Sequence, residues 1–323
     1  MRTVAGLLAI TACCLVPQAA SAATISSDGT ITFRSGAEAS DLVILPFNPA
    51  QVLYAGGPLT VGAGCLAGPP VTCQPGDLDA RLGPGDDRKK GPVSSFVETV
   101  YGGSGDDEIF AGGIGNTVRG GPGDDLAVIS NDGRGDLAGN SGDDRLESFG
   151  DGVSTVSGGF GDDIVIGNGA DNDDLSGGPG RDVLISTRSS SRFFHGDADG
   201  GAGSDVISAP ATGPRLPWTW TMHGGTGADT ILGSPGTDTI AGGTGNDAID
   251  VSGDGQADTV ACGDGRDIVA ADGDDTVAAD CERVIAGPLD IGTPARAALD
   301  RATTFVTQAT HLNLESFGPL LVG

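Results

Sequence analysis

Aromatic residues are scarce in this sequence and make up only 4% of its 323 positions. Small and turn-forming residues are abundant instead, with 57 Gly and 18 Pro. A chain of this length with an ordinary close-packed core carries more large apolar side chains and fewer backbone breakers. The composition therefore argues against a single close-packed core.

Side chains for common catalytic chemistry are also few. Histidine occurs only as His195, His223 and His311, and lysine only as Lys89 and Lys90. No H-E-x-x-H and no G-x-S-x-G segment is present, so zinc-protease and α/β-hydrolase chemistry lack their parts. We expect no catalytic site. The alternative is an extracellular polysaccharide lyase or epimerase built on a parallel β-helix. Such an enzyme would need a cluster of Lys, Arg, Tyr or His side chains, and lysine is confined to positions 89 and 90.

Glutamate is scarce although the chain is strongly acidic. Only six of the 44 acidic residues are Glu, and the formal net charge is −27. A generic acidic surface would use Glu as freely as Asp, whereas turns and oxygen-ligand cation sites favour the shorter Asp carboxylate. The acidity therefore points to cation sites. It also argues against nucleic acid as a partner, because a phosphate backbone would be repelled.

The first 22 residues predict export. Arg2 precedes an apolar run over residues 4–16, and residues 20–22 read Ala-Ser-Ala, which is typical of a signal-peptide cleavage site. The run of roughly 13 residues is too short for a membrane span, so we expect no transmembrane segment. A secreted, extracellular protein is the main prediction. Residues 10–13 resemble a lipoprotein cleavage box, which leaves open a lipid anchor on Cys13.

Residues 23–98 are expected to form a small β-rich cap. Strand-like alternation occurs near 23–33 and 41–45, and residues 82–87 resemble a degenerate first repeat. The terminal unit of a stacked array must differ from interior units because its outer face meets water. Four cysteines remain after signal cleavage, which suggests two disulfides in an exported chain. Sequence proximity favours the pairs Cys65 with Cys73 and Cys262 with Cys281.

Repeats follow the cap, and they are clearest between Gly224 and Asp250. Three nine-residue units there obey G-G-x-G-x-D-x-U-x, where U is a large aliphatic residue, and only Ser234 departs at a glycine position. Upstream matches recur at intervals of 18, 19, 19 and 19 residues, with weaker units between them. They begin at Gly102, Gly120, Gly139, Gly158 and Gly177. One strong and one weak unit therefore make one structural period.

This period predicts an all-β fold. In each unit the first six residues suit a turn, and the last three suit a short strand whose middle residue points inward. Two turns and two strands close one coil, and coils stack as parallel strands about 4.8 Å apart. We expect a parallel β-roll, a solenoid similar to a β-helix, over residues 99–286. Residues one coil apart then lie above one another.

The sixth-position aspartates therefore form columns. We expect one column in the first half of the roll and two in the second, with Asp229 and Asp247 on one side and Asp238 and Asp258 on the other. Stacked carboxylates repel, and a divalent cation between turns reverses that repulsion. Ca²⁺ suits carboxylate and carbonyl oxygens in a flexible loop better than Mg²⁺ does. The predicted calcium ligands are Asp107, Asp125, Asp144, Asp163, Asp182, Asp205, Asp229, Asp238, Asp247, Asp258, Asp267 and Asp275.

The nonapeptides resemble the RTX or haemolysin-type calcium-binding repeat. This resemblance covers roughly residues 100–280. It implies that the sixth-position Asp side chains and turn carbonyls hold Ca²⁺ between coils, and that the fifth-position aspartates are solvated. At residue 117 the sixth position is Thr, which weakens the case for a site there. The segment with Cys262 and Cys281 is similar to the C-terminal part of secreted proteins of this kind. RTX toxins and proteases typically leave the cell through a C-terminal signal, whereas this chain carries an N-terminal one.

Two insertions interrupt the repeats, over residues 186–199 and 209–223. They carry Arg, Phe, His and both tryptophans, Trp218 and Trp220. One interpretation is a protruding patch for a glycan or cell-surface partner across 186–223. The favoured one is a pair of loops that cover the roll. After Val284 the repeats stop, and residues 287–323 are expected to form either a helix that caps the far end or a loose tail.

Overall fold

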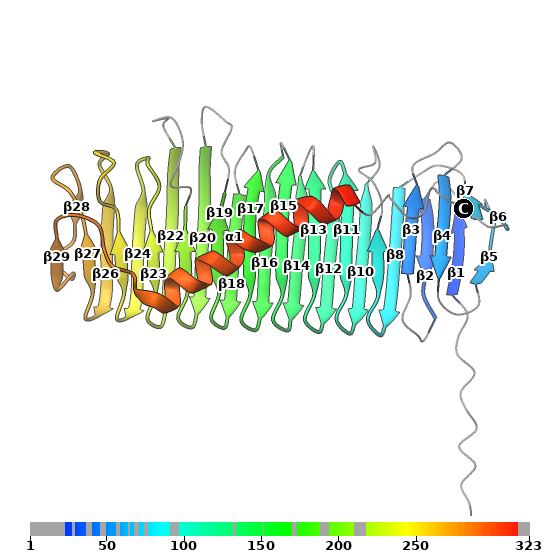
Figure 1. Ribbon diagram of the computed structural model, residues 1–323, viewed down its shortest axis with the longest axis horizontal. Coiled ribbons are helices and arrows are strands. Elements are labelled where there is room, and N and C mark those ends of the chain that lie inside the picture. Colours follow the sequence, from blue (N-terminus) through cyan, green and yellow to red (C-terminus); the bar gives the residue numbers. More distant parts are fainter. Residues whose placement is uncertain are drawn as a thin grey trace, which may run out of the picture.

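The computed structural model describes residues 23–27, 30–36, 41–45, 50–55, 59–63, 65–67, 71–73, 77–90, 97–131, 134–150, 152–169, 173–187, 194–209 and 218–315. The predicted signal peptide, including Cys13, lies outside these residues. Two long sheets and one helix form an elongated solenoid (Figure 1). The predicted all-β fold of parallel coils is confirmed.

Sheet A contains 14 strands and sheet B contains 15. From the C-terminal to the N-terminal end, sheet A consists of β28 (Thr276–Val277), β26 (Thr259–Gly265), β24 (Thr239–Gly245), β22 (Trp218–Thr226), β20 (Phe194–Ala202), β18 (Asp173–Pro179), β16 (Ser154–Phe160), β14 (Gly135–Ser141), β12 (Thr117–Pro122), β10 (Glu98–Ser104), β8 (Asp77–Pro84), β2 (Thr30–Arg34), β1 (Ala23–Ser27) and β5 (Leu59–Val61). Sheet B consists of β29 (Arg283–Ile285), β27 (Ile268–Ala270), β25 (Ala248–Asp250), β23 (Thr230–Leu232), β21 (Val206–Ser208), β19 (Val183–Ser186), β17 (Ile164–Gly169), β15 (Arg145–Gly150), β13 (Leu126–Asn131), β11 (Glu108–Gly113), β9 (Arg88–Lys90), β3 (Asp41–Leu45), β4 (Ala50–Ala55), β7 (Val71–Cys73) and β6 (Cys65–Leu66).

Successive coils pair in parallel and in register. Ile109 of β11 lies opposite Ala127 of β13, which lies opposite Leu146 of β15. The chain alternates between the sheets, so that one strand in each sheet makes a coil. Parallel pairing already joins β2 to β8 and β8 to β10. The coils therefore begin within residues 23–98.

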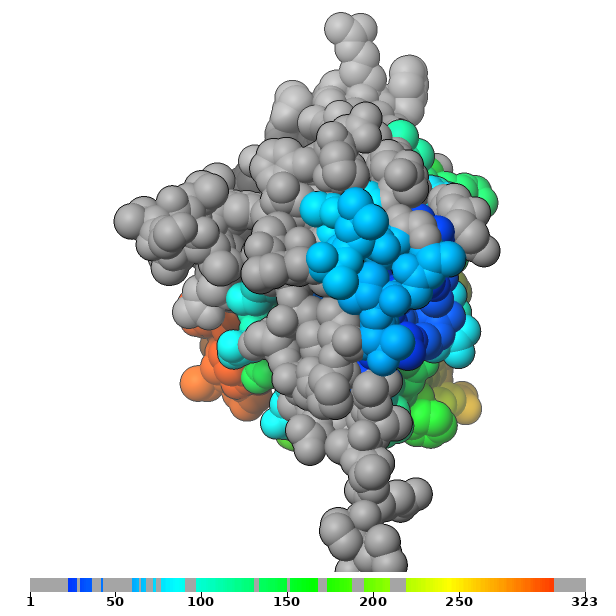
Figure 2. Space-filling model, turned by 90° about the vertical axis from the view of Figure 1, so that its right-hand side faces the viewer, coloured from blue at the N-terminus to red at the C-terminus, as the bar shows by residue number. Residues whose placement is uncertain are grey.

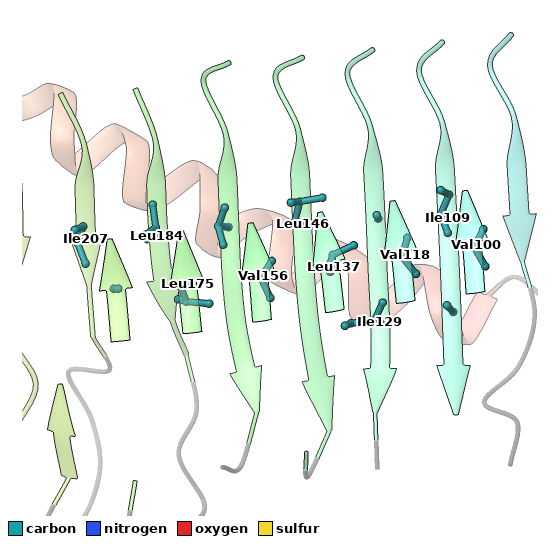
Figure 3. Packing of buried hydrophobic residues seen from close by; sticks show 14 of the residues in the cluster. Val100, Ile109, Val118, Ile129, Leu137, Leu146, Val156, Leu175, Leu184 and Ile207 are labelled. Atoms are coloured by element: carbon teal, nitrogen blue, oxygen red, sulfur yellow. The ribbon is translucent and has the colours of Figure 1, made fainter. Parts of the chain in front are cut away.

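Inward-pointing aliphatic side chains from both sheets form one continuous core (Figure 3). Val100 and Val118 come from sheet A, and Ile109 and Leu146 from sheet B; all four are fully buried. The middle aliphatic residue of each repeat lies in this core, as predicted. The buried members are Ile109, Leu146, Val165, Leu184, Ile207, Ile231, Ile240, Ile249, Val260 and Val269.

The N-terminal end of the solenoid is covered by antiparallel hairpins. Strand β1 pairs with β2, and β3 pairs with β4. A disulfide links Cys65 to Cys73 at this end, and a second links Cys262 to Cys281 across adjacent coils at the other. Both predicted disulfide pairs are confirmed.

A single helix, α1 (Gly292–Glu315), follows the last strand. It lies along the outer face of sheet B, where Ala295, Ala298 and Ala302 pack against Val183 and Ile185. In the view from the N-terminal end, α1 (orange) lies beside the solenoid (Figure 2). Of the two alternatives left open by the sequence, the structure has the helix, but this helix lies along sheet B and not over the far end, because the outward side chains of this part of sheet B are apolar and the helix covers them.

Residues 188–193 and 210–217 of the two insertions lie outside the described residues, and they include Phe193 and the predicted arginines. The described part of the second insertion contains Trp220, whose side chain is only 2% exposed. This tryptophan belongs to the solenoid core and does not contribute to a surface patch. Among the described residues, no helix is long and apolar enough to span a membrane.

Candidate metal columns

A column of buried aspartates follows the turns that lead from sheet A into sheet B. We call it the first column. In each coil the backbone N–H of the aspartate donates a hydrogen bond of 2.8 or 2.9 Å to Oδ1 of the aspartate one coil further along. Glu282 closes the series by accepting from the N–H of Asp267 at 2.9 Å. The column consists of Asp87, Asp107, Asp125, Asp144, Asp163, Asp182, Asp205, Asp229, Asp247 and Asp267.

In the column from Asp107 to Asp267, the second carboxylate oxygen, Oδ2, is buried without a hydrogen-bond partner. A buried polar atom without a partner costs free energy, so a series of them needs a physical explanation. In this repeated arrangement the unpaired atom always occupies the same place in the turn. The residues concerned in the first column are Asp107, Asp125, Asp144, Asp163, Asp182, Asp205, Asp229, Asp247 and Asp267.

Around six of the position-one glycines, Oδ2 of the column aspartate and a carbonyl oxygen of the next coil both lie within 2.7 Å of the place that a Cβ atom would take; these are Gly102, Gly139, Gly177, Gly200, Gly224 and Gly242. A Cβ atom placed on Gly102 would lie 2.2 Å from Asp107 Oδ2 and 2.6 Å from the carbonyl oxygen of Gly120. The same pair of oxygens recurs around Gly224, where the distances are 2.5 Å to Asp229 Oδ2 and 2.5 Å to the Gly242 carbonyl. Glycine at position one therefore leaves a space that a side chain would fill. This space is lined by a carboxylate oxygen and a carbonyl oxygen.

Burial raises the pKa of the first-column aspartates from Asp107 to Asp247 above the usual value of 3.8. Loss of hydration is the main cause, since it penalises the charged form, and the neighbouring carboxylates raise the pKa further. The pKa reaches about 8 for Asp144 and Asp182, and about 7 for Asp107. The backbone N–H bond to Oδ1 acts in the opposite direction but is weaker. A nearby cation would favour the charged form.

A second column lies on the opposite side, where sheet B leads into sheet A. Its clearest part is Asp238, Asp258 and Asp275 on successive coils. The N–H of Asp238 donates to Asp258 Oδ1 at 2.7 Å, and the N–H of Asp258 donates to Asp275 Oδ1 at 3.1 Å. Burial raises the pKa of Asp238 and of Asp258 to about 7. Asp258 Oδ2 is buried without a partner, as in the first column.

The second column is eroded toward the N-terminus. The strand register places Trp220, Ser154, Asn116 and Glu98 at the positions that Asp238 and Asp258 occupy further along. Buried Asp173 is also in this register, so the second side carries one aspartate in the first half of the roll as well.

The structure places the twelve predicted ligands in these two columns, and their role as ligands stays a prediction. Sequence analysis missed Asp87 and Glu282 at the ends of the first column and Asp173 in the second. It also misplaced one position: Asn116 and not Thr117 occupies the sixth place of its turn, with its Oδ1 accepting from the N–H of Glu98 at 3.2 Å. The sequence did offer a signal for this position, because Asn116 is the polar residue directly before strand β12.

The fifth-position aspartates are largely exposed and form a ladder of their own. Asp124 donates its N–H to Asp106 Oδ1 at 2.9 Å, and Asp143 donates to Asp124 Oδ1 at 2.8 Å. The ladder ends where Arg181 pairs with Asp162 and lowers its pKa. These side chains stabilise neighbouring turns as well as being solvated.

Within the described residues, no three His, Cys, Asp or Glu side chains converge on one point. Each coil supplies one column carboxylate, so backbone carbonyls would have to complete any coordination shell. Ca²⁺ accepts this donor set, because it binds carboxylate and carbonyl oxygens in varied geometry. The buried Oδ2 atoms and the adjacent glycine carbonyls therefore fit calcium.

Comparison with known families identifies the repeat. The model described as RTX calcium-binding nonapeptide repeat (4 copies) matches residues 94–127, 150–184 and 221–249. No curated protein and no solved structure gave a significant match. The resemblance noted in the sequence is confirmed for these three segments, which include parts of both columns.

Proposed function

Because the chain contains RTX calcium-binding nonapeptide repeats, we propose that it binds Ca²⁺ along both columns and needs calcium to complete its fold. The proposed protein is secreted and non-catalytic, with a structural or cell-surface and matrix role. A surface or glycan partner across 186–223 remains part of this proposal.

The buried, unpaired Oδ2 atoms carry the proposal. Without a cation, the first column holds a line of buried carboxylates that either remain charged next to one another or take up protons. Both outcomes destabilise the folded state at neutral pH. Calcium bound to Oδ2 and to the carbonyl of the next coil would neutralise this charge and bridge the coils. Ligand binding to the folded state alone stabilises it by mass action.

Export is supported by the two disulfides. Cys65–Cys73 and Cys262–Cys281 join residues that are close in sequence, and such bonds persist in oxidising compartments. The leader-like residues 1–22 agree with this location. A non-catalytic role is supported by the scarcity of side chains for acid–base chemistry: the chain has three histidines and two lysines, and one of these, Lys89, is completely buried.

Circular dichroism of the purified protein tests the proposal. In calcium-free buffer we expect an incomplete β spectrum, and millimolar CaCl₂ should restore the full one. Equal MgCl₂ is the matched control, since Mg²⁺ demands stricter octahedral geometry and gives up its waters reluctantly. A β spectrum that is complete in chelator and unchanged by calcium would contradict the proposal.

A further inference from the structure

Lys89 occupies a position in the solenoid core that is aliphatic in the coils on either side. The register places it between Leu42 of β3 and Ile109 of β11. Its side chain is completely buried, whereas Lys90, the next residue, lies on the outer face and pairs with Glu108 at 3.0 Å. A lysine is almost never fully buried unless its charge is paired.

The buried ammonium group is surrounded by oxygen atoms. Nζ donates to Glu98 Oε2, with which it forms an ion pair, and to the carbonyl oxygen of Phe110 at 2.8 Å. The N–H of Gly112 donates to the same Glu98 oxygen at 3.3 Å. One carboxylate and one backbone carbonyl therefore contact a single positive charge. This is the same class of donors that a column turn offers to calcium.

Glu98 belongs to the second column. Its strand position is in register with Asn116, and through the following coils with Asp238 and Asp258. At the N-terminal end of this column, Glu98 thus already has a positively charged partner. This partner is the Lys89 ammonium group, which belongs to the chain itself.

We propose that Lys89 is a built-in counter-ion that replaces calcium at the first coil of the second column. It lets the second-column side of this coil, where β9 leads into β10, close before calcium binds and provide an edge on which later coils stack, whereas the first-column side still carries Asp107, whose Oδ2 is buried without a partner. The inference rests on the proposed calcium dependence of those later coils. The antiparallel hairpins β1–β2 and β3–β4 support this edge from the other side, and none of their described residues is a column aspartate.

The energetics of buried ion pairs make the proposal testable. Removing one partner of such a pair leaves an uncompensated charge and is strongly destabilising, whereas replacing both partners with uncharged groups is often tolerated. Lys89→Met should therefore leave Glu98 in need of an external cation or a proton. Lys89→Met combined with Glu98→Gln should remove that need.

The experiment is hydrogen exchange of the full chain. It is measured peptide by peptide, in calcium-free buffer and in millimolar CaCl₂. In the wild type we expect β9 and β10 to be protected without calcium, and the turn at Asp107 and β12–β27 to gain protection only with it. Lys89→Met should raise the calcium-free exchange rate of β9 and β10 at least tenfold. The double variant should regain this protection, and Lys90→Met, at the partly exposed position next along the chain, should resemble wild type.

The outcomes separate this inference from the proposed function. If calcium changes protection nowhere in the wild type, the proposed function fails. If β12–β27 responds to calcium but β9 and β10 are unprotected in its absence, the built-in counter-ion is overturned. It is also overturned if Lys89→Met behaves like Lys90→Met, or if the double variant stays as unprotected as the single one.

Discussion

The backbone N–H of Asp144 donates a 2.8 Å hydrogen bond to Oδ1 of Asp163, one coil ahead, while Oδ2 of Asp163 is buried without a partner. One oxygen of the carboxylate thus holds two coils together, and the other is left for a cation. Because the same division recurs along the first column, each aspartate has a structural role that does not need calcium and a second one that does.

The first prediction separates these two roles. Asp144→Asn keeps Oδ1 as an acceptor but replaces the unpaired oxygen with an amide nitrogen, which cannot bind a cation. We expect the calcium-dependent part of the unfolding free energy to fall by about 1 to 3 kcal/mol, the range for a lost buried polar partner. Calcium titration of thermal unfolding measures it. Asp143→Asn, at the exposed neighbouring position, should leave the calcium dependence unchanged, and equal effects of the two variants would count against the ligand role.

The second prediction concerns pH in the absence of calcium. Burial raises the pKa of Asp144 and Asp182 to about 8, from 3.8 in the unfolded chain. Between about pH 4 and pH 8 the folded state therefore binds more protons than the unfolded state, so stability falls as pH rises through this window. The calcium-free protein should melt at a higher temperature at pH 5 than at pH 8.

Salt provides the control for this pH effect. The net charge of −27 also destabilises the folded state at higher pH, but that general repulsion is screened by salt. Buried carboxylates are screened much less. A difference in melting temperature that persists in 1 M NaCl supports the column explanation, whereas one that disappears points to surface charge alone.

The solenoid and the columns could be predicted from sequence because their cause is local and repeated. Glycine and aspartate at fixed places specify each turn, and the period places Asp107 above Asp125. The pair Cys262–Cys281 follows from the same period, since its separation of 19 residues is one coil and its Cα atoms are 5.1 Å apart.

Features that depend on contacts outside the repeat could not be predicted. From sequence alone, a lysine is expected to be solvated. Only the register of β9 against β3 and β11 shows that Lys89 points inward. The placement of α1 depends on Val183, Ile185 and Val206, whose apolar character marks burial but does not say what covers them. Asp173 was missed because its turn is one residue longer than the motif: Asp173 is the sixth residue after Gly167, whereas Asp107 is the fifth after Gly102.

The third prediction tests why position two of the repeat is glycine. Gly121 has a φ of +138°, and a Cβ there would lie 1.8 Å from the carbonyl oxygen of Gly103. Gly121→Ala must therefore push two coils apart, and we expect a loss of more than about 3 kcal/mol, since strain and collision add. Gly253 has a φ of +93° with nothing within 4 Å of its Cβ position, so Gly253→Ala carries the strain alone. Chemical denaturation in saturating calcium compares them, and equal losses would refute close stacking as the cause.

The fourth prediction concerns helix α1, whose contact face is separate from the solenoid core. Ala302 is fully buried against sheet B, and Ala302→Asp would bury a carboxylate without a partner, which costs several kcal/mol. The helix is held in the described region mainly by small side chains, so we expect it to detach while the coils remain folded. Amides of residues 295–304 should then exchange faster, and a hydrophobic dye should bind the uncovered Val183 and Ile185. Thr304→Asp, on the exposed side of the helix, is the matched control. If Ala302→Asp instead abolishes the calcium-induced β spectrum, the helix is needed for the fold of the coils and is more than a cover for one face.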